Sequence, residues 1–366
     1  MSKNRIVGYD VARAFAVFGM VVVNFKIVME ATENGPAWLV RLVGLIDGRA
    51  AATFVVLAGV GLSLLSRNGR ESADSGLLAE NRNTLLRRAL FLFVVGLLYT
   101  EIWPADILHF YGVYIGVASF LLTTSAFRLR VITGALVLGF VAMLVALNYD
   151  QGWDWNTLEY EGFWTLLGMA RHILFNGFHP VVPWLAFMLV GMLIGRLDMG
   201  APSVRRRVFL TGVSVAVTAE FISWFLLRTL APEDSLTEEE GLAAILGSGP
   251  MPPLPLYMLA GGGTASALIA ASVALGERCR DSAWLRPLIA TGQLALTLYV
   301  AHVLIGMGTL EVTGRLYDQT LPFSLLASFV FCVGSVAFAS LWRSRFERGP
   351  LEAIMRFLTE PRRRAS

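Results

Sequence analysis

Long apolar stretches recur along the whole chain, and short polar stretches separate them. A helix that crosses a membrane needs about 20 consecutive apolar residues, and runs of this length differ from the patterns of soluble helices and strands. The pattern therefore predicts an all-α polytopic membrane protein with one integral-membrane domain over residues 1–366. The predicted spans are 10–29, 48–66, 86–103, 106–124, 130–148, 180–197, 207–229, 253–275, 287–309 and 322–342.

One further apolar stretch, FWTLLGMARHILFNGF at residues 163–178, carries Arg171 and His172 and is short for a span. We expect it to form a re-entrant or interfacial helix. The basic residues support this count, because cytoplasmic loops are enriched in Lys and Arg. With both termini in the cytoplasm, 23 of the 30 basic residues lie in cytoplasmic segments. An eleventh span would reverse this bias in every later loop.

Composition agrees with the pattern: 55% of the residues are hydrophobic, 16% are charged, and the mean hydropathy is +0.62. Soluble domains carry about 25% charged residues, so a soluble enzyme or a nucleic-acid-binding protein is not expected. Cys279 and Cys332 are too few for a disulfide framework and lack the spacing of a metal site. We find no phosphate-binding loop or zinc signature and expect no metal.

Several polar residues interrupt the apolar stretches. An ionisable group inside a membrane is costly, and it is therefore a candidate for function. Three of the four histidines fall at a similar depth in three different spans, and His172 lies in the short segment nearby. The outer-half candidates are Asn24, Asp47, Arg49, Asp106, His109, His179 and His302. Glu220 lies in the middle of a span, and the sequence assigns it no role.

The stretch ADILHFYG places Asp106 and His109 three residues apart at the start of a predicted span. This spacing puts both side chains on one face of a helix. The carboxylate can then hold the imidazole in one tautomer and raise its basicity, as acid–base catalysis requires. Alternatively, Asp106 caps the helix that follows Pro104. The two roles are compatible.

Asp10 and Arg13 show the same spacing at the inner end of the first span. They form either an ion pair that anchors the helix end or a contact with a phosphate-bearing donor from the cytoplasm. Four tryptophans near the outer side suit an interfacial aromatic belt, and they also suit stacking against a sugar. These are Trp103, Trp153, Trp155 and Trp184.

Seven stretches carry a family resemblance: GYDVARAFAVFGMVVVN, DGRAAATFVVLAGVGLSL, RRALFLFVVGLLY, WPADILHFYGVY, HPVVPWLAFMLVGMLIGR, GQLALTLYVAHVLIGM and WRSRFERGPLEAIMR. Together they resemble the bacterial YeiB-type family (domain of unknown function 418), the catalytic part of heparan-α-glucosaminide N-acetyltransferase and, more distantly, other transmembrane acyltransferases. The resemblance implies ten or eleven helices around a pore-like active site. It also implies transfer of an acyl group, with acetyl the expected one, from cytoplasmic acyl-CoA to an acceptor outside.

The resemblance implies that Asn24, which matches the asparagine of the family's VN motif, polarises the acyl carbonyl. The heparan enzyme carries its catalytic histidine in the loop after that motif, whereas this loop has none. Glu30 or Glu33 stands there instead, or His109 serves from another helix, with His179 and His302 as further candidates. We expect the donor at the inner-side residues Asp10, Arg13, Arg87 and Arg88, and Arg49 of the outer half is a further donor-binding candidate.

These observations predict an acyl-CoA-dependent O- or N-acyltransferase of the bacterial inner membrane. Its expected partners are acyl-CoA, a saccharide or envelope acceptor and membrane lipid, and a homodimer is left open. One alternative is a transporter or channel for a small solute or proton that uses the same histidines as a relay. Another is a structural or sensory membrane protein.

Overall fold

The computed structural model describes residues 5–155, 157–230 and 244–360. The chain forms two compact units, and each unit is assembled from separate stretches of sequence. The first unit comprises Met1–Leu57, Asp198–Val213 and Gly263–Arg356, and the second comprises Ala58–Leu197, Ser214–Gly262 and Phe357–Ser366. The single-domain organisation expected from the sequence stays a prediction.

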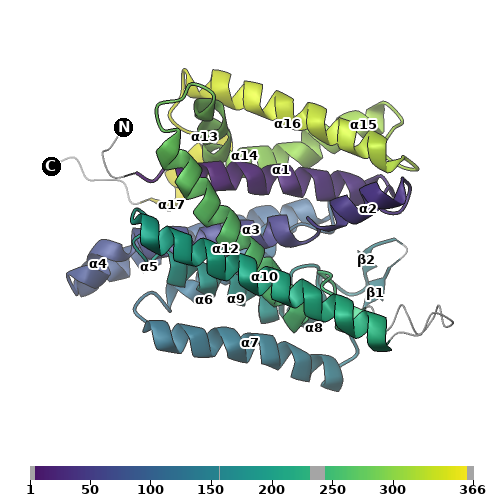
Figure 1. The fold of residues 1–366 in the computed structure, drawn as a ribbon, viewed down its shortest axis with the longest axis horizontal. Coiled ribbons are helices and arrows are strands. Elements are labelled where there is room, and N and C mark those ends of the chain that lie inside the picture. The colour runs from purple at the N-terminus through teal and green to yellow at the C-terminus, as the bar shows by residue number, and fades with distance from the viewer. Residues whose placement is uncertain (1–4, 156, 231–243, 361–366) are drawn as a thin grey trace. The chain divides into compact units, whose positions relative to one another are not determined.

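Helices account for nearly all the regular structure of the described residues (Figure 1). Eight helical segments there are long and apolar enough to cross a membrane, and the protein is thus an all-α polytopic membrane protein. They are Gly8–Val28, Ala37–Leu65, Ser75–Thr100, Ala126–Ala146, Pro202–Leu230, Pro255–Arg278, Ala295–Val312 and Leu321–Arg343. A ninth span is formed if Leu166–Asn176 and Val181–Ile194, which are bent by 52°, are taken together.

This count is lower than the ten spans expected, and the difference lies in two helices of the second unit. The predicted span 106–124 contains α6 (Leu108–Ser119), which has 12 residues, and 180–197 contains α9 (Val181–Ile194), which has 14. At 1.5 Å per residue they extend about 18 and about 21 Å, less than the ~30 Å thickness of a bilayer's hydrocarbon core. The expected short element at 163–178 is present as α8 (Leu166–Arg171) and the π-helical segment η1 (His172–Asn176).

In the first unit, α1 (Gly8–Val28) packs against α13 (Leu285–Gln293), α14 (Ala295–Ala301) and α16 (Leu321–Arg343), and Figure 1 shows α1 and α16 running side by side. Glycine allows the closest approach. A Cβ at Gly292 would lie 1.7 Å from the Asp10 carbonyl oxygen, so only a residue without a side chain fits there. The remaining elements of this unit are α2 (Ala37–Gly44), the π-helical η2 (His302–Met307) and α15 (Gly308–Val312).

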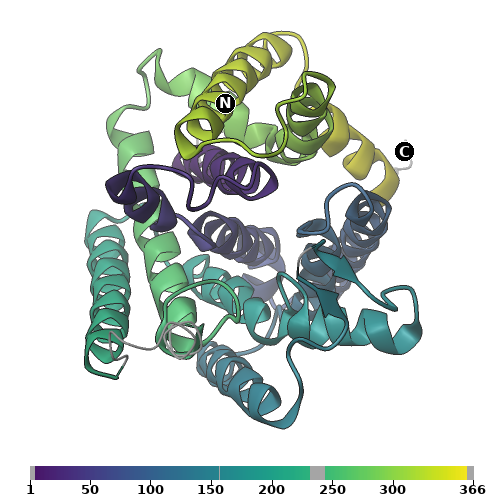
Figure 2. The same cartoon turned by 90° about the vertical axis from the view of Figure 1, so that its right-hand side faces the viewer.

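Four helices contribute residues to both units: α3 (Arg49–Leu65), α10 (Pro202–Leu230), α12 (Pro255–Arg278) and α17 (Pro350–Thr359). In the second unit, α4 (Arg67–Glu71) leads into α5 (Ser75–Thr100), which packs along α6, while α7 (Ala126–Ala146) packs along α9. A short antiparallel hairpin of β1 (Trp153–Asp154) and β2 (Glu159–Tyr160) pairs Trp153 with Tyr160. Figure 2 shows this hairpin beside the α8–η1 segment.

The apolar surfaces of the long helices fit a lipid environment. In the 18-residue apolar stretch of α7 that could cross a membrane, only 11% is buried inside the protein, and in that of α10 only 17%. Large apolar side chains such as Leu138 and Val145 are exposed on α7. Water would penalise so much apolar exposure, whereas lipid chains do not.

Candidate functional site

Asp106 and His109 form a buried pair at the start of α6. One carboxylate oxygen, Oδ2 of Asp106, accepts hydrogen bonds from the backbone N–H groups of Leu108 (2.8 Å) and His109 (3.3 Å), and it lies 3.2 Å from Nδ1 of His109. Both side chains are completely buried. The capping role and the orienting role expected for Asp106 are therefore both present in the geometry.

This contact fixes the chemistry of the His109 ring. An ionised carboxylate only accepts hydrogen bonds, so Nδ1 carries the proton and Nε2 presents a lone pair. Nε2 is buried and has no hydrogen-bond partner among the described residues. Because buried polar atoms are normally hydrogen-bonded, this nitrogen marks a place for a ligand atom or a water molecule.

Two more histidines lie next to this pair, all around the ring of Phe110. The His109 and His172 rings are 5.7 Å apart, and Phe110 lies 5.3 Å from His172 and 5.9 Å from His179. Nδ1 of His172 and Nδ1 of His179 are also buried without a hydrogen-bond partner among the described residues. Tyr114 on α6 donates a hydrogen bond to the backbone carbonyl of His179, which ties the loop before α9 to α6.

The β-hairpin closes this group of histidines from one side. Trp153 and Tyr160 contact the ring of His172 at 5.5 and 4.8 Å. The Tyr160 hydroxyl donates to Oδ1 of Asn176 (2.9 Å), and Nδ2 of Asn176 donates to the carbonyls of Tyr149 (2.7 Å) and Gln151 (2.9 Å). Burial raises the pKa of Tyr160, so its hydroxyl stays protonated as a donor.

Sequence reasoning missed Asn176, although it lies in the apolar stretch 163–178, and it missed Tyr160, which lies in the polar segment before that stretch. It named the tryptophans, and the structure shows their surroundings. Trp153 and Trp155 stack on each other at 4.7 Å, and Trp155 also stacks on Tyr149 at 6.4 Å. Trp184 is completely buried, 4.6 Å from the ring of His179.

The first unit holds a second polar pair, Asn24 and His302. Nδ2 of Asn24 lies 2.8 Å from Nε2 of His302, and Nδ1 of His302 contacts the carbonyl of Tyr299. A carbonyl only accepts, so Nδ1 carries the proton and Nε2 accepts from Asn24. His302 therefore orients the amide of Asn24 and has no lone pair left for use as a base. His302 also begins η2, and π-helical turns often occur at functional sites.

The structure thus brings Asn24 together with His302, and Asp106 and His109 together with His172 and His179. These two groups belong to different units. The cavity predicted to join His109 with Asn24 and His302 stays a prediction.

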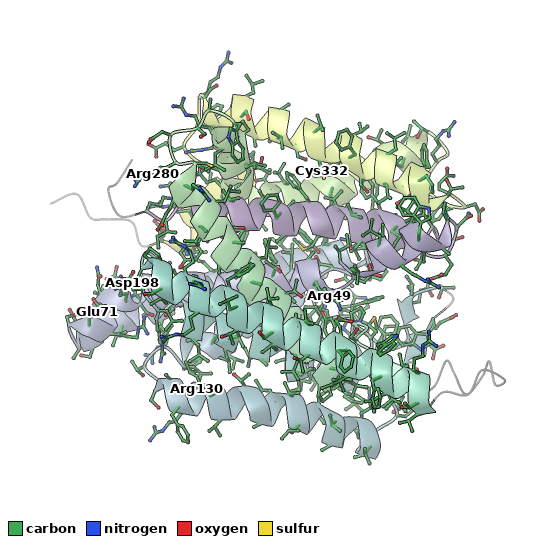
Figure 3. All side chains as sticks on the ribbon, in the orientation of Figure 1. Arg49, Glu71, Arg130, Asp198, Arg280 and Cys332 are labelled. Carbon is green, nitrogen blue, oxygen red and sulfur yellow. The ribbon has the colours of Figure 1, made fainter. Side chains whose placement is uncertain are left out.

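Asp47 and Arg49, both named from the sequence, belong to a third polar group of the first unit, and its third member, Lys26, was missed. Nζ of Lys26 lies 2.8 and 2.6 Å from the two carboxylate oxygens of Asp47. Arg49, labelled in Figure 3, donates to the backbone carbonyl of Asp47 at 3.1 Å. A lysine in the last turn of a span, two residues after Asn24, was the signal available in the sequence.

Asp10 and Arg13, two of the residues expected to bind the donor, contact each other within the protein. Asp10 is 1% exposed, and its two oxygens bind Arg13 (2.6 Å) and Arg5 (2.7 Å), with Gln293 at 3.3 Å. The anchoring ion pair is therefore present, and a phosphate contact of Arg13 stays a prediction.

Two further charged residues have partners elsewhere in the second unit. Arg88 binds Glu360 at 3.1 Å, whereas the side chain of Arg87 is exposed. Glu220, which the sequence left unassigned, accepts a hydrogen bond from the Ser248 hydroxyl at 2.7 Å. Among the described residues, no group of three or more His, Cys, Asp or Glu side chains is arranged to hold a metal ion.

Comparison with known families identifies two matching regions. The family described as heparan-alpha-glucosaminide N-acetyltransferase, catalytic, matches residues 5–225, which is more than half of the chain. The family described as protein of unknown function (DUF418) matches residues 200–362. No curated protein matches the chain.

Proposed function

Because the chain belongs to the heparan-α-glucosaminide N-acetyltransferase catalytic family, we propose that it is a membrane-embedded acyltransferase. It transfers an acyl group, with acetyl the first candidate, from acyl-CoA to a hydroxyl or amine acceptor. The acceptor class is a saccharide or envelope component on the outer side of a bacterial inner membrane. Both termini then face the cytoplasm, where the donor is available.

Nε2 of His109, which has no hydrogen-bond partner within the part of the chain that the structure describes, is the observation that carries the proposal. It is a buried imidazole nitrogen with a lone pair, and its opposite nitrogen is held by a buried carboxylate. This arrangement is the base-and-orienting-group part of an acyl-transfer site. His109 also takes the place that a loop histidine occupies in the family, since the loop after Asn24 contains none.

The proposed reaction follows from this geometry. Nε2 of His109 removes the proton of the acceptor as the acceptor's oxygen or nitrogen bonds to the thioester carbonyl carbon. The carbon–sulfur bond then breaks, and the protonated imidazole returns the proton to the departing thiolate. The Asp106 carboxylate stabilises the transient imidazolium. Asn24, whose amide is oriented by His302, stays a predicted hydrogen-bond donor to the acyl oxygen.

The test uses the full chain in lipid nanodiscs, acetyl-CoA and a set of sugar amines and alcohols, with acceptor-dependent release of free CoA as the readout. His109→Ala should reduce transfer about 10²–10⁴-fold, which is the usual contribution of a positioned acid–base group. Asp106→Asn should lose less, because the base remains. Asp150→Asn makes the same chemical change at an exposed carboxylate and should leave transfer unchanged. All variants should still bind acetyl-CoA.

Near-normal transfer by His109→Ala, together with a loss in Glu30→Gln, Glu33→Gln or His179→Ala, would move the chemistry to another residue. A wild-type protein that binds no acyl-CoA but moves protons or a small solute across a vesicle membrane would favour the transporter alternative. Dimer formation and lipid partners stay predictions.

A further inference from the structure

Arg70 and Arg196 lie close together in the second unit, at the end away from His109, His172 and His179. Arg70 on α4 donates to the backbone carbonyl of Ser63 (2.7 Å) and to its hydroxyl (3.1 Å). Arg196, just after α9, donates to the carbonyls of Thr124 (2.7 Å) and Leu122 (3.2 Å). A Cβ at Gly195 would lie 2.7 Å from the Cβ of Ser63, so the residue before Arg196 packs closely against the residue that anchors Arg70.

The charges of these arginines are not neutralised by an ion pair. Neither guanidinium forms a salt bridge with a carboxylate of the described residues, and the nearby Glu71 binds Arg67 at 2.7 Å. Nε of Arg70 and Nε of Arg196 are buried and have no hydrogen-bond partner among the described residues. Each side chain therefore keeps a charged N–H group available after its bonds to the carbonyls are counted.

The two guanidinium groups also influence each other. Burial lowers the pKa of Arg196, and the positive charge of Arg70 lowers it further. Burial likewise lowers the pKa of Arg70, although the charge of Glu71 partly opposes this. Arginine nevertheless stays protonated in proteins, so the two cations lie within electrostatic range of each other. An anion between them would relieve this repulsion and use the remaining N–H groups.

The position of the pair relative to the histidines is set by two short helices of the same unit. Helix α6 begins at the Asp106–His109 pair and leads to the Leu122 and Thr124 carbonyls, which Arg196 binds. Helix α9 begins just after His179 and ends next to Arg196. Both helices therefore run from the histidines to the arginines, over about 18 and about 21 Å.

We propose that Arg70 and Arg196 together bind phosphate groups, and that these are the phosphates of the acyl-CoA donor. The assignment to the donor rests on the proposed function. An acyl-CoA molecule carries its phosphates at one end of a long flexible arm and its thioester at the other. Helices α6 and α9 likewise separate the Arg70–Arg196 pair from the histidines. Two of the arginines named from the sequence bind carboxylates instead, since Arg13 binds Asp10 and Arg88 binds Glu360.

The experiment measures CoA binding by calorimetry, with the full chain in nanodiscs of phosphatidylcholine. Arg70→Gln and Arg196→Gln should each weaken CoA binding about tenfold to a hundredfold, the range for a lost charge-assisted contact with phosphate. Arg130→Gln is the matched control, because Arg130 is an exposed arginine in the first turns of α7 at the same end of the unit (Figure 3). Its CoA affinity should equal that of the wild type.

If the glutamine variants do not fold, Arg70→Lys and Arg196→Lys provide the test, since they keep the charge but lose the fork of N–H donors. A smaller drop in CoA affinity then supports the pair. Wild-type affinity in folded variants at both positions would overturn the site and leave the acyltransferase proposal intact.

A wild type that binds no CoA would overturn the proposed function and, with it, the assignment to the donor. In that case, a second set of nanodiscs containing phosphatidylglycerol would identify the source of the phosphate. Retention of that lipid only when both arginines are present would assign the pair to a lipid headgroup.

Discussion

At the residue scale, Lys26 and Asp47 show how a charge is kept inside an apolar helix bundle. The Lys26 side chain is 4% exposed, and its ammonium group is held by both oxygens of a carboxylate that is 26% exposed. An isolated ammonium at this depth would pay a large desolvation penalty, and the carboxylate offsets it only while the two-oxygen contact is intact. The pair therefore fixes the end of α1 to the start of α3, two residues from Asn24.

We expect Asp47→Asn to destabilise the protein by about 3–5 kcal/mol, because it leaves the buried Lys26 without its counter-charge. The double variant Lys26→Met, Asp47→Asn should recover most of this loss, since the buried cation is then gone. Denaturant unfolding in mixed micelles, followed by tryptophan fluorescence, measures both. Equal destabilisation of the single and double variants would show that the carboxylate acts through some other contact.

Residue-scale prediction from the sequence succeeded where partners lie within one turn of a helix. The spacing of Asp106 and His109 predicted that they share a face, and Asp10 with Arg13 followed the same rule. Asn24 and His302 were both named, but they are 278 positions apart, and no local pattern could indicate that they form a pair. Asn176 and the Arg70–Arg196 pair were missed, because their partners are backbone carbonyls brought near only by folding.

At the element scale, apolar length predicted that helices exist but not where they end. The predicted span 106–124 is mostly apolar after His109, yet α6 ends at Ser119, and the chain turns before Ser125 caps α7. The hydropathy pattern does not reveal this turn, because Phe120, Leu121 and Leu122 are apolar. The short helical element expected at 163–178 is present as α8 and η1, and its re-entrant or interfacial position stays a prediction.

The position of His109 depends on close packing between α5 and α6. A Cβ at Gly96 of α5 would lie 2.2 Å from the His109 backbone nitrogen, so Gly96→Ala must push α6 away. We expect this variant to lose about 1–3 kcal/mol of stability through overpacking. It should also lose most transfer activity, because small displacements of catalytic groups are costly.

Gly116→Ala is the control on the same helix pair, since its Cβ would lie 3.8 Å from the Cβ of Ala89, an ordinary contact. Thermal unfolding and the acceptor-dependent release of CoA measure both variants. Equal tolerance of the two substitutions would contradict the packing argument.

At the scale of the whole molecule, we expect more membrane crossings than there are described helices long enough to cross. Within the second unit, α5 and α7 are full-length spans, while α6 and α9 are short. The ends of α6 and α9 meet where Arg196 binds the Thr124 carbonyl, and the Arg70 site, ahead of α5, lies at that same end. The chain therefore returns to this end through α6 and again through α9, and we expect both short helices to cross the membrane.

We therefore predict ten crossings with both termini on one side of the membrane, as the concentration of Lys and Arg in alternate loops also indicates. The test starts from a chain with Cys279→Ser and Cys332→Ala and adds single cysteines at the exposed positions Ser72, Thr157 and Ser344. In intact cells an impermeant maleimide should label Thr157→Cys, whereas Ser72→Cys and Ser344→Cys should react only after the membrane is opened. Labelling of Ser344→Cys but not Ser72→Cys in intact cells would mean an odd number of crossings. In that case α6 or α9 would enter the membrane and leave on the side from which it came.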